Sequence, residues 1–306
     1  MKINKIPLVG YADKLSARQG ETIELKISCD SSIYDAYLVR VISCDPNPEG
    51  PGIIEEDLKS VFSGKYDGKR QVVSLGSAMR VKNNELFDTL DSFTILTTIW
   101  PTTPQLGLQG LISRRFPESS EGFALAIDKN GVTALIGNYR VSVGKPLLER
   151  RWYRVWMTYN SSSKTVSVGQ TPIRERYDAD DSGYRETSIK NASLGTGDLL
   201  IASFQGDPRS AHYNGKIENP IILKTALKLN DLVSFSVDCI NDQIFANWDF
   251  SKKIDSAEIL DLGPYQLHGS LENLPTRAMT SSEWNGTSHD WTKKPEHYAA
   301  IHFHDD

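Results

Sequence analysis

Two histidines and an aspartate near the end of the sequence are the residues best suited to bind a metal. His302 and His304 are two positions apart, so their imidazoles would share one face of a strand, and Asp305 follows directly. Imidazole and carboxylate groups are both ligands for divalent cations. His302, His304 and Asp305 are therefore a candidate metal site. A closed site needs further ligands, so a polar strand end is the simpler interpretation.

An acidic stretch in the middle of the chain is similar to the start of a calcium-binding loop. Asp178, Asp180 and Ser182 would supply oxygen ligands at the first, third and fifth positions, and Gly183 stands at the sixth. The twelfth position, where such a loop has a bidentate glutamate, is Ile189. Asp178 and Asp180 remain candidate ligands of a looser single-loop calcium site, and a solvated surface insertion is the alternative.

Two of the six tryptophans could form a platform for a sugar ring. Trp152 and Trp156 lie four positions apart, which predicts that they share one face of a strand. Their neighbours Tyr153, Val155 and Met157 are also apolar, which indicates that both faces of the strand are covered. Core packing is therefore favoured over ligand stacking.

Motifs for catalysis are absent from the sequence. It contains no G-x-S-x-G, H-E-x-x-H or G-x-x-x-x-G-K-[ST] pattern, and no closely spaced carboxylate triplet on one strand. Cys29 and Cys44 lie in apolar strand contexts, which favours packing over a nucleophilic role. We therefore assign no catalytic residue and no cofactor to this chain.

The composition is that of a globular protein without strong charge. The chain has 306 residues, enough for about two domains, and its 34 basic and 39 acidic side chains give a net charge of −5. This charge disfavours nucleic-acid partners, and no apolar run approaches the ~18 residues of a membrane span. Three cysteines and the lack of a signal-peptide core predict a cytoplasmic location.

Alternating apolar and polar residues predict an all-β protein. Helix signals are weak, and the best of them, Lys224–Leu232, is short. The sequence Asp128-Lys-Asn-Gly131 predicts a hairpin with a type I′ turn, and Asn160–Ser163 predicts a second hairpin. Eight short strands are expected in the larger part of the chain: 93–100, 108–114, 123–128, 132–137, 152–159, 165–170, 199–204 and 215–223.

The Pro- and Gly-rich segment Asp45–Gly52 interrupts an earlier group of strands, so residues 8 to about 82 are expected to form a small antiparallel sandwich. The predicted organisation is a small Ig-like β-sandwich over residues 1–85, a larger sandwich over residues 86–275 and an extended segment over residues 276–306.

Four segments of the larger sandwich, in the expected order, are similar to a known fold family. They resemble the laminin-G-like branch of the concanavalin A-like jelly rolls, over about residues 88–270. The segments are Phe93–Pro101, Gly110–Arg114, Trp152–Asn160 and His212–Leu227.

Further segments, spread over the whole chain, resemble the large (beta) subunit family of N,N-dimethylformamidase. They are Gly10–Ser16 with Gly20–Glu24, Leu38–Ile42 with Asp45–Gly52, and Asn273–Thr280 with Ala300–Asp306. The resemblance implies an amidohydrolase that converts N-substituted formamides to an amine and formate, at a mononuclear non-haem iron held by tyrosines and a glutamate. It places that iron in a C-terminal domain that is absent from this chain.

The resemblance therefore implies a truncated, non-catalytic front portion with a structural or assembly role. Its partners would be the remainder of the large subunit and a small subunit. The alternative is a free-standing laminin-G-like module that binds a carbohydrate or a protein.

The end of the sequence also predicts self-association. Ala300–Asp306 alternates like a strand but is followed by no partner strand, so an unpaired edge with Phe303 facing solvent is expected. Together with apolar residues in Tyr265–Met279 and Tyr298–Phe303, this edge would favour a homo-oligomer that weakens when residues 298–306 are removed.

Overall fold

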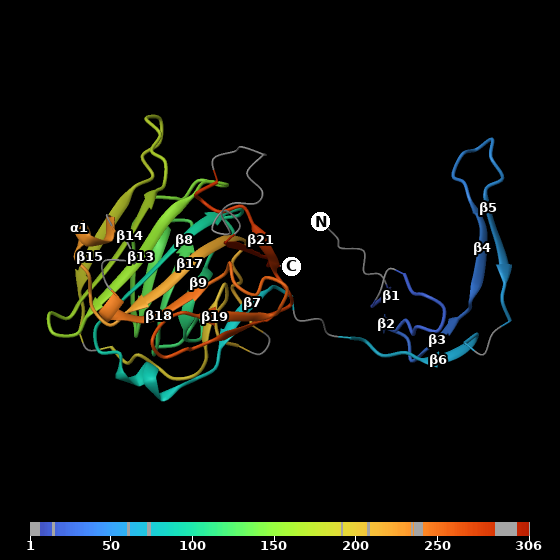
Figure 1. Cartoon of the computed structure of the whole chain (residues 1–306), viewed down its shortest axis with the longest axis horizontal. Coiled ribbons are helices and arrows are strands. Elements are labelled where there is room, and N and C mark those ends of the chain that lie inside the picture. Colours follow the sequence, from blue (N-terminus) through green and yellow to red (C-terminus); the bar gives the residue numbers. More distant parts are fainter. Residues whose placement is uncertain are drawn as a thin grey trace. The chain divides into compact units, whose positions relative to one another are not determined.

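The computed structural model divides the chain into two compact units, an N-terminal unit from Met1 to Val73 and a sandwich unit from Ser74 to Asp306 (Figure 1). We describe each unit by itself. The structure describes residues 7–13, 16–59, 62–71, 75–190, 192–206, 209–233, 235, 241–284 and 299–305.

The sandwich unit is one continuous network of 16 antiparallel strands that folds over into two facing sheets, a jelly-roll sandwich, which confirms the all-β prediction. One sheet runs in the order β12 (Tyr139–Ser142), β11 (Gly131–Ile136), β10 (Phe123–Asp128), β9 (Gln109–Arg114), β16 (Leu199–Ile201), β7 (Ala78–Val81), β20 (Gly269–Glu272) and β19 (Glu258–Asp261). The other runs in the order β18 (Ile244–Asp249), β17 (Gly215–Leu223), β8 (Phe93–Pro101), β13 (Tyr153–Asn160), β14 (Thr165–Pro172) and β15 (Gly183–Ser188). Helical turns in the described residues are short: η1 (Glu85–Thr89), α1 (Leu229–Val233) and η3 (Asn241–Gln243).

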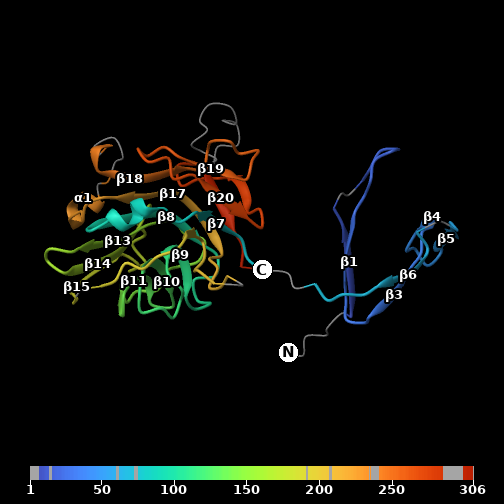
Figure 2. The same ribbon diagram turned by 90° about the horizontal axis from the view of Figure 1, so that it is seen from below.

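The central strands of the sandwich, such as β9, β10 and β11, bury both of their faces. On β10, Phe123 and Leu125 point into the main core between the sheets, whereas Ala124 and Ala126 lie on the opposite face under Phe204. This alternation follows from the two-residue period of a strand. Figure 2 shows β8, β13, β14 and β17 beside one another in one layer, as their hydrogen-bonded pairing requires.

The outer face of β13 is covered by α1, which explains the burial of one tryptophan. Trp156 is 1% exposed and packs with Leu96, Leu232 and neighbouring residues in a second apolar cluster. Tyr159 is also buried. The preference for core packing is therefore right for Trp156, and neither ring offers a stacking platform.

The predicted hairpin between β10 and β11 is present, but the prediction of a type I′ turn was wrong. Asp128 pairs with Gly131, so Lys129 and Asn130 form the loop, and of these four described residues only Gly131 has a positive φ, +88°. A type I′ turn would need positive φ at both loop residues. Asp128 Oδ1 instead accepts a hydrogen bond from the Asn130 backbone N–H at 2.6 Å, which stabilises the loop.

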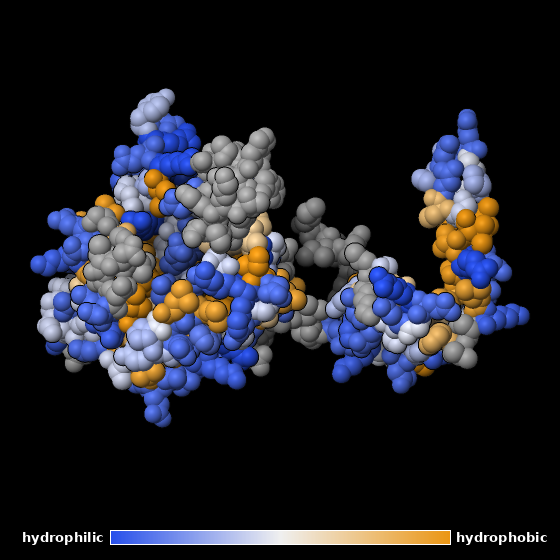
Figure 3. Space-filling model, in the orientation of Figure 1, coloured by the Kyte–Doolittle hydropathy of each residue, from blue (hydrophilic) through white to orange (hydrophobic). Residues whose placement is uncertain are grey.

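The N-terminal unit consists of three separate two-stranded ladders. β1 (Leu8–Ala12) pairs with β2 (Leu25–Cys29), β3 (Ile33–Ala36) with β6 (Gly64–Asp67), and β4 (Val39–Cys44) with β5 (Ile53–Asp57). Among the described residues of this unit, only Cys29 is buried, and Cys44 is exposed, which is at odds with a packing role for it. Apolar surface gathers over β4 and β5 (Figure 3).

The last strand is not an open edge, and this expectation was wrong. β22 (Ala300–Phe303) pairs with β17 on one side and with β21 (Thr276–Met279) on the other. Ile301 and Phe303 are both 0% exposed and belong to the main core. The described strand therefore cannot drive the predicted self-association, and Tyr298 lies outside the described residues.

Candidate functional site

The three predicted metal ligands lie near one another, but they do not form a metal site in the described structure. The rings of His302 and His304 stack with their centroids 4.7 Å apart, and Asp305 Oδ1 accepts a hydrogen bond from Asn214 Nδ2. No three His, Cys, Asp or Glu side chains of the described residues meet in a metal-binding arrangement. These residues do not fit the iron that the resemblance implies, and we derive no step through it.

The two predicted calcium ligands point to cations of the protein rather than to each other. Asp178 receives two hydrogen bonds from Arg176, at 2.9 and 2.6 Å, and Asp180 is paired with Lys145. The Arg176 guanidinium holds the pKa of Asp178 below its ordinary value. In the described structure the stretch is thus a surface loop crossed by ion pairs.

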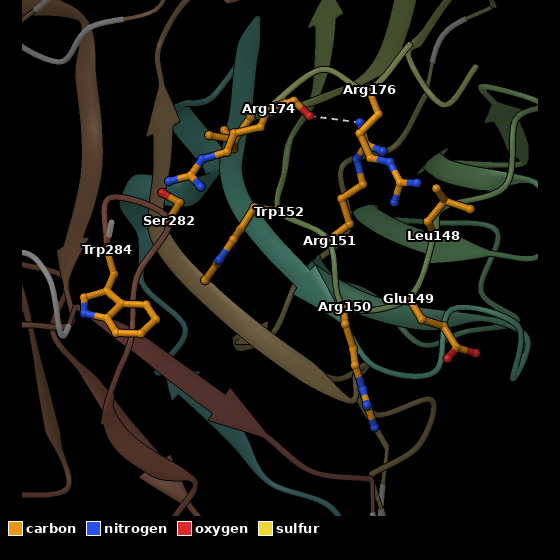
Figure 4. Close-up of a pocket in the computed structure, with 10 residues that line it drawn as sticks. Leu148, Glu149, Arg150, Arg151, Trp152, Arg174, Arg176, Ser282 and Trp284 are labelled. Carbon is orange, nitrogen blue, oxygen red and sulfur yellow. Dashed lines mark hydrogen bonds between the residues drawn. The ribbon is translucent and has the colours of Figure 1, made fainter. Parts of the chain in front are cut away.

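A cleft of about 410 Å³ lies at one end of the sandwich (Figure 4). This volume lies within the range that small-molecule sites occupy. Its lining combines arginine with tryptophan: Leu148, Glu149, Arg150, Arg151, Trp152, Ile173, Arg174, Arg176, Ser282 and Trp284.

The cleft forms where β13 begins and β14 ends. These strands are antiparallel neighbours, so the residues before Tyr153 lie beside those after Pro172, and the Ile173 backbone N–H donates to the Trp152 carbonyl at 2.9 Å. The loop before β13 is fixed by a 2.7 Å hydrogen bond from the Arg150 backbone N–H to the Pro101 carbonyl. Arg150 has a φ of +54°, a conformation that non-glycine residues rarely adopt, so the surrounding contacts hold this loop in place.

A buried polar group orients one arginine of the cleft. Asp181 is 4% exposed, accepts a hydrogen bond from the Tyr153 hydroxyl and lies 3.1 Å from Nε of Arg151. Nη2 of Arg151 donates to the Arg174 carbonyl at 2.9 Å, while Nη1 is buried and has no hydrogen-bond partner in the described structure. Burial and the bond to Asp181 raise the pKa of Tyr153, so this hydroxyl stays a donor at neutral pH. This framework leaves Nη1 without a partner in the described structure.

The remaining arginines give the cleft an excess of positive charge. Four arginines and one glutamate line it, and the Arg150 and Arg174 guanidinium groups have no ion-pair partner among the described residues. In Figure 4, Arg174 points toward Ser282, on the same side as Trp152 and Trp284, and Arg150 and Glu149 extend the other way. The electrostatics of the cleft therefore favour an anion.

A buried acidic residue holds one wall of the cleft in position. Glu218 on β17 is 1% exposed and accepts hydrogen bonds from both the backbone N–H and the hydroxyl of Ser282. Beside it, Lys216 donates to Thr280 and lies 5.9 Å from the Trp152 ring centroid. Burial raises the pKa of Glu218 and lowers that of Lys216, because each charge loses water.

This cleft was not predicted from the sequence, and no role was assigned there to Arg150, Arg151, Arg174 or Arg176. A usable signal was present, since one arginine pair precedes a predicted strand and the other follows its antiparallel neighbour, which brings the pairs together.

The chain is similar along nearly its whole length to two curated proteins. It is 32% identical to the N,N-dimethylformamidase beta subunit of Paracoccus aminophilus over 332 aligned residues, which cover 98% of this chain and 44% of that protein. The same values of identity and coverage hold for the beta subunit of an Alcaligenes species. The chain is a relative of the dimethylformamidase beta subunits. It spans less than half the length of these curated relatives.

Solved structures with a similar fold include other β-sandwich proteins. A candidate carbohydrate-binding protein from Bacteroides ovatus is 14% identical, with a TM-score of 0.48, over 72% of this chain and 66% of that one. The LG1–3 region of the laminin alpha2 chain is 10% identical, with a TM-score of 0.38, over 51% and 32%. At these scores neither likeness indicates a ligand. No family model matches the chain.

No helix of the described residues has both the length and the apolar character that are needed to cross a bilayer.

Proposed function

We propose that this chain is a non-catalytic portion of a dimethylformamidase-like amidohydrolase, in which it has an assembly role. The reaction would be the hydrolysis of N-substituted formamides to an amine and formate. The iron that the family resemblance implies, and the residues that hold it, would belong to a further domain of the large subunit. A small subunit would complete the assembly, and the location would be cytoplasmic.

The exposed apolar strands of the N-terminal unit carry this proposal. Val41 and Ile42 on β4 are 54% and 59% exposed, and Ile53 on β5 is 70% exposed. Contiguous apolar surface of this kind is typical of a contact with another domain or chain. In a relative of the dimethylformamidase beta subunits, the remainder of the enzyme is the partner that fits this surface.

The first experiment separates catalysis from assembly. The purified 306-residue chain, incubated with ferrous iron and N,N-dimethylformamide, is expected to release no dimethylamine above a protein-free blank. Sustained turnover would contradict the non-catalytic assignment. The Paracoccus aminophilus beta subunit, assayed with its enzyme partners, is the positive control for the same iron and substrate stocks.

A second experiment tests the assembly role. Val41→Asp with Ile42→Asp, made at the equivalent aligned positions of the Paracoccus aminophilus beta subunit, should reduce the amount of assembled enzyme in sedimentation velocity. Asp at the equivalent of the exposed Tyr177 in the sandwich unit is the control and should leave assembly intact. Equal assembly of both variants would overturn the proposed role of the N-terminal unit.

A further inference from the structure

We propose that the cleft between β13 and β14 binds a small carboxylate whose charged group lies next to a ring. The site differs from the surface of the N-terminal unit on which the assembly role rests, and the two proposals stand or fall separately. The cleft combines unpaired donors, apolar rings beside them and a framework of buried polar groups.

The donors fit a carboxylate. A guanidinium group presents parallel N–H donors in one plane, which match the two oxygens of a carboxylate. Nη1 of Arg151 is buried and unpaired in the described structure, and a buried donor without a partner costs free energy that a ligand oxygen would recover. The Arg174 guanidinium, which has no carboxylate partner among the described residues, supplies a second set of donors.

The rings fit the rest of such a ligand. Trp152 is half-buried, and Trp284 is 36% exposed, so both indoles present apolar surface to the cleft. The Lys216 ammonium lies 5.9 Å from the centroid of the Trp152 ring, a cation–π distance, so one charged group already contacts this indole. A flat or puckered ring attached to the carboxylate would cover this surface.

The framework keeps this geometry rigid. Arg151 is held at one end by Asp181, which is itself buried and bonded to Tyr153. Ser282, on the facing wall, is held by two hydrogen bonds to Glu218. Preorganised donors lose little conformational entropy when a ligand binds, so even a small molecule can be held.

The test measures binding of sodium glucuronate and sodium benzoate to the full 306-residue chain by isothermal titration calorimetry. Glucose, which has the ring without the charge, and acetate, which has the charge without the ring, are the matched ligands. Binding of glucuronate, benzoate or both, with each at least about tenfold tighter than glucose and acetate, supports the proposal. Glucuronate alone identifies acidic sugars as the source of the carboxylate, and benzoate alone identifies aromatic acids.

Variants connect that binding to the cleft. Arg174→Gln removes an exposed guanidinium that makes no hydrogen bond or ion pair with the described residues, and it should weaken binding at least about tenfold. Arg185→Gln removes the same charge from an exposed position on β15 outside the cleft and should leave binding unchanged. Equal thermal melting midpoints would show that both variants fold.

Three outcomes would overturn the proposal. They are the absence of binding by both ring carboxylates, an equal loss of binding in the two arginine variants, and binding of inorganic phosphate that is as tight as that of the ring carboxylates. The last would mean an unspecific anion site. None of these outcomes affects the assembly experiments above, which use a different surface.

Discussion

The N-terminal unit and the sandwich unit have similar sequence patterns but very different packing. Both alternate apolar and polar residues, and both form antiparallel ladders. In the sandwich unit Ile95 and Phe123 are 0% exposed, whereas Ile42 and Leu25 in the N-terminal unit are mostly exposed. The difference lies in the second layer: two facing sheets bury each other, and an isolated pair of strands has nothing to face.

The exposed ladders of the N-terminal unit need another element to cover their apolar faces. Two-stranded ladders are marginal in water unless another element covers an apolar face. The sandwich unit carries its own core and needs no such cover to fold. The same apolar residue should therefore matter greatly to the stability of one unit and little to that of the other.

The largest expected effect comes from the sandwich core. Phe245 is 0% exposed and contacts the rings of Phe87 and Tyr265 at centroid distances of 5.4 and 5.3 Å. Phe245→Ala should lower the free energy of unfolding by about 4 kcal/mol, whereas Ile42→Ala should change it by less than about 0.5 kcal/mol. Circular dichroism during urea unfolding follows the strands of both units and measures both variants. Similar losses from both substitutions would contradict the contrast.

A second pair of substitutions compares a buried arginine with an exposed one. Arg114 is 1% exposed, donates to the carbonyls of Gly195 and Gly197, and pairs with Asp88 at 2.9 Å. Arg114→Leu leaves those carbonyls unsatisfied and should cost about 3 kcal/mol.

The control for this substitution is Arg40→Leu in the N-terminal unit. The ion pair of Arg40 with Glu56, at 3.3 Å, is exposed, so its loss should cost at most about 1 kcal/mol. Circular dichroism during chemical unfolding measures both variants. A cost for Arg114→Leu no larger than that for Arg40→Leu would break the comparison.

A third pair uses two glycines with positive φ. A Cβ at Gly131 (φ +88°) would lie 2.0 Å from the Lys145 carbonyl oxygen, whereas a Cβ at Gly52 (φ +73°) would meet nothing within 4 Å. Gly131→Ala adds a steric clash to backbone strain and should cost about 2–3 kcal/mol, against about 1 kcal/mol of strain alone for Gly52→Ala. Thermal melting would order the two variants, and the reverse order would show that the hairpin is loosely packed.

The smallest effect concerns pH and the wall of the cleft. Burial raises the pKa of Glu218, so the folded state keeps its proton at pH values where the unfolded chain has lost it. The stability contributed by Glu218 is therefore greatest below about pH 4.5 and decreases as the pH rises through the folded pKa. Glu218→Gln should remove this decrease, and urea unfolding at several pH values measures it. An unchanged pH dependence would contradict the assigned burial.

Much of the sandwich could be predicted from its sequence, because its strands are bounded by turn residues and filled with β-branched and aromatic side chains. β10 and β17 have the bounds that the sequence predicts for them, 123–128 and 215–223. The partners of β22 could not be predicted, since pairing between strands distant in sequence leaves no local pattern. The burial of Phe303 depends entirely on that pairing.

The cleft was harder to predict than the fold. Arg151 and Arg174 belong to no recognisable sequence motif. Asp181 orients the Arg151 guanidinium, whereas the Arg174 guanidinium has no ion-pair partner among the described residues. The predicted metal and calcium ligands had recognisable spacing but not the required geometry: Asp178 and Asp180 each lie against a cation of the chain. Spacing along a chain reports which residues can share a face, and only the fold decides what faces them.

Hydrogen exchange measured by mass spectrometry on the isolated 306-residue chain tests the central contrast most directly. Amides in β8, β13 and β17 should exchange slowly, because the sandwich unit opens only when its core unfolds. Amides in β1 to β6 should exchange within seconds to minutes, close to the rate of an unfolded chain, because almost no apolar residue there is buried. Protection of β1 to β6 as strong as that of β8, β13 and β17 would contradict the conclusion that the N-terminal unit needs a partner to cover it.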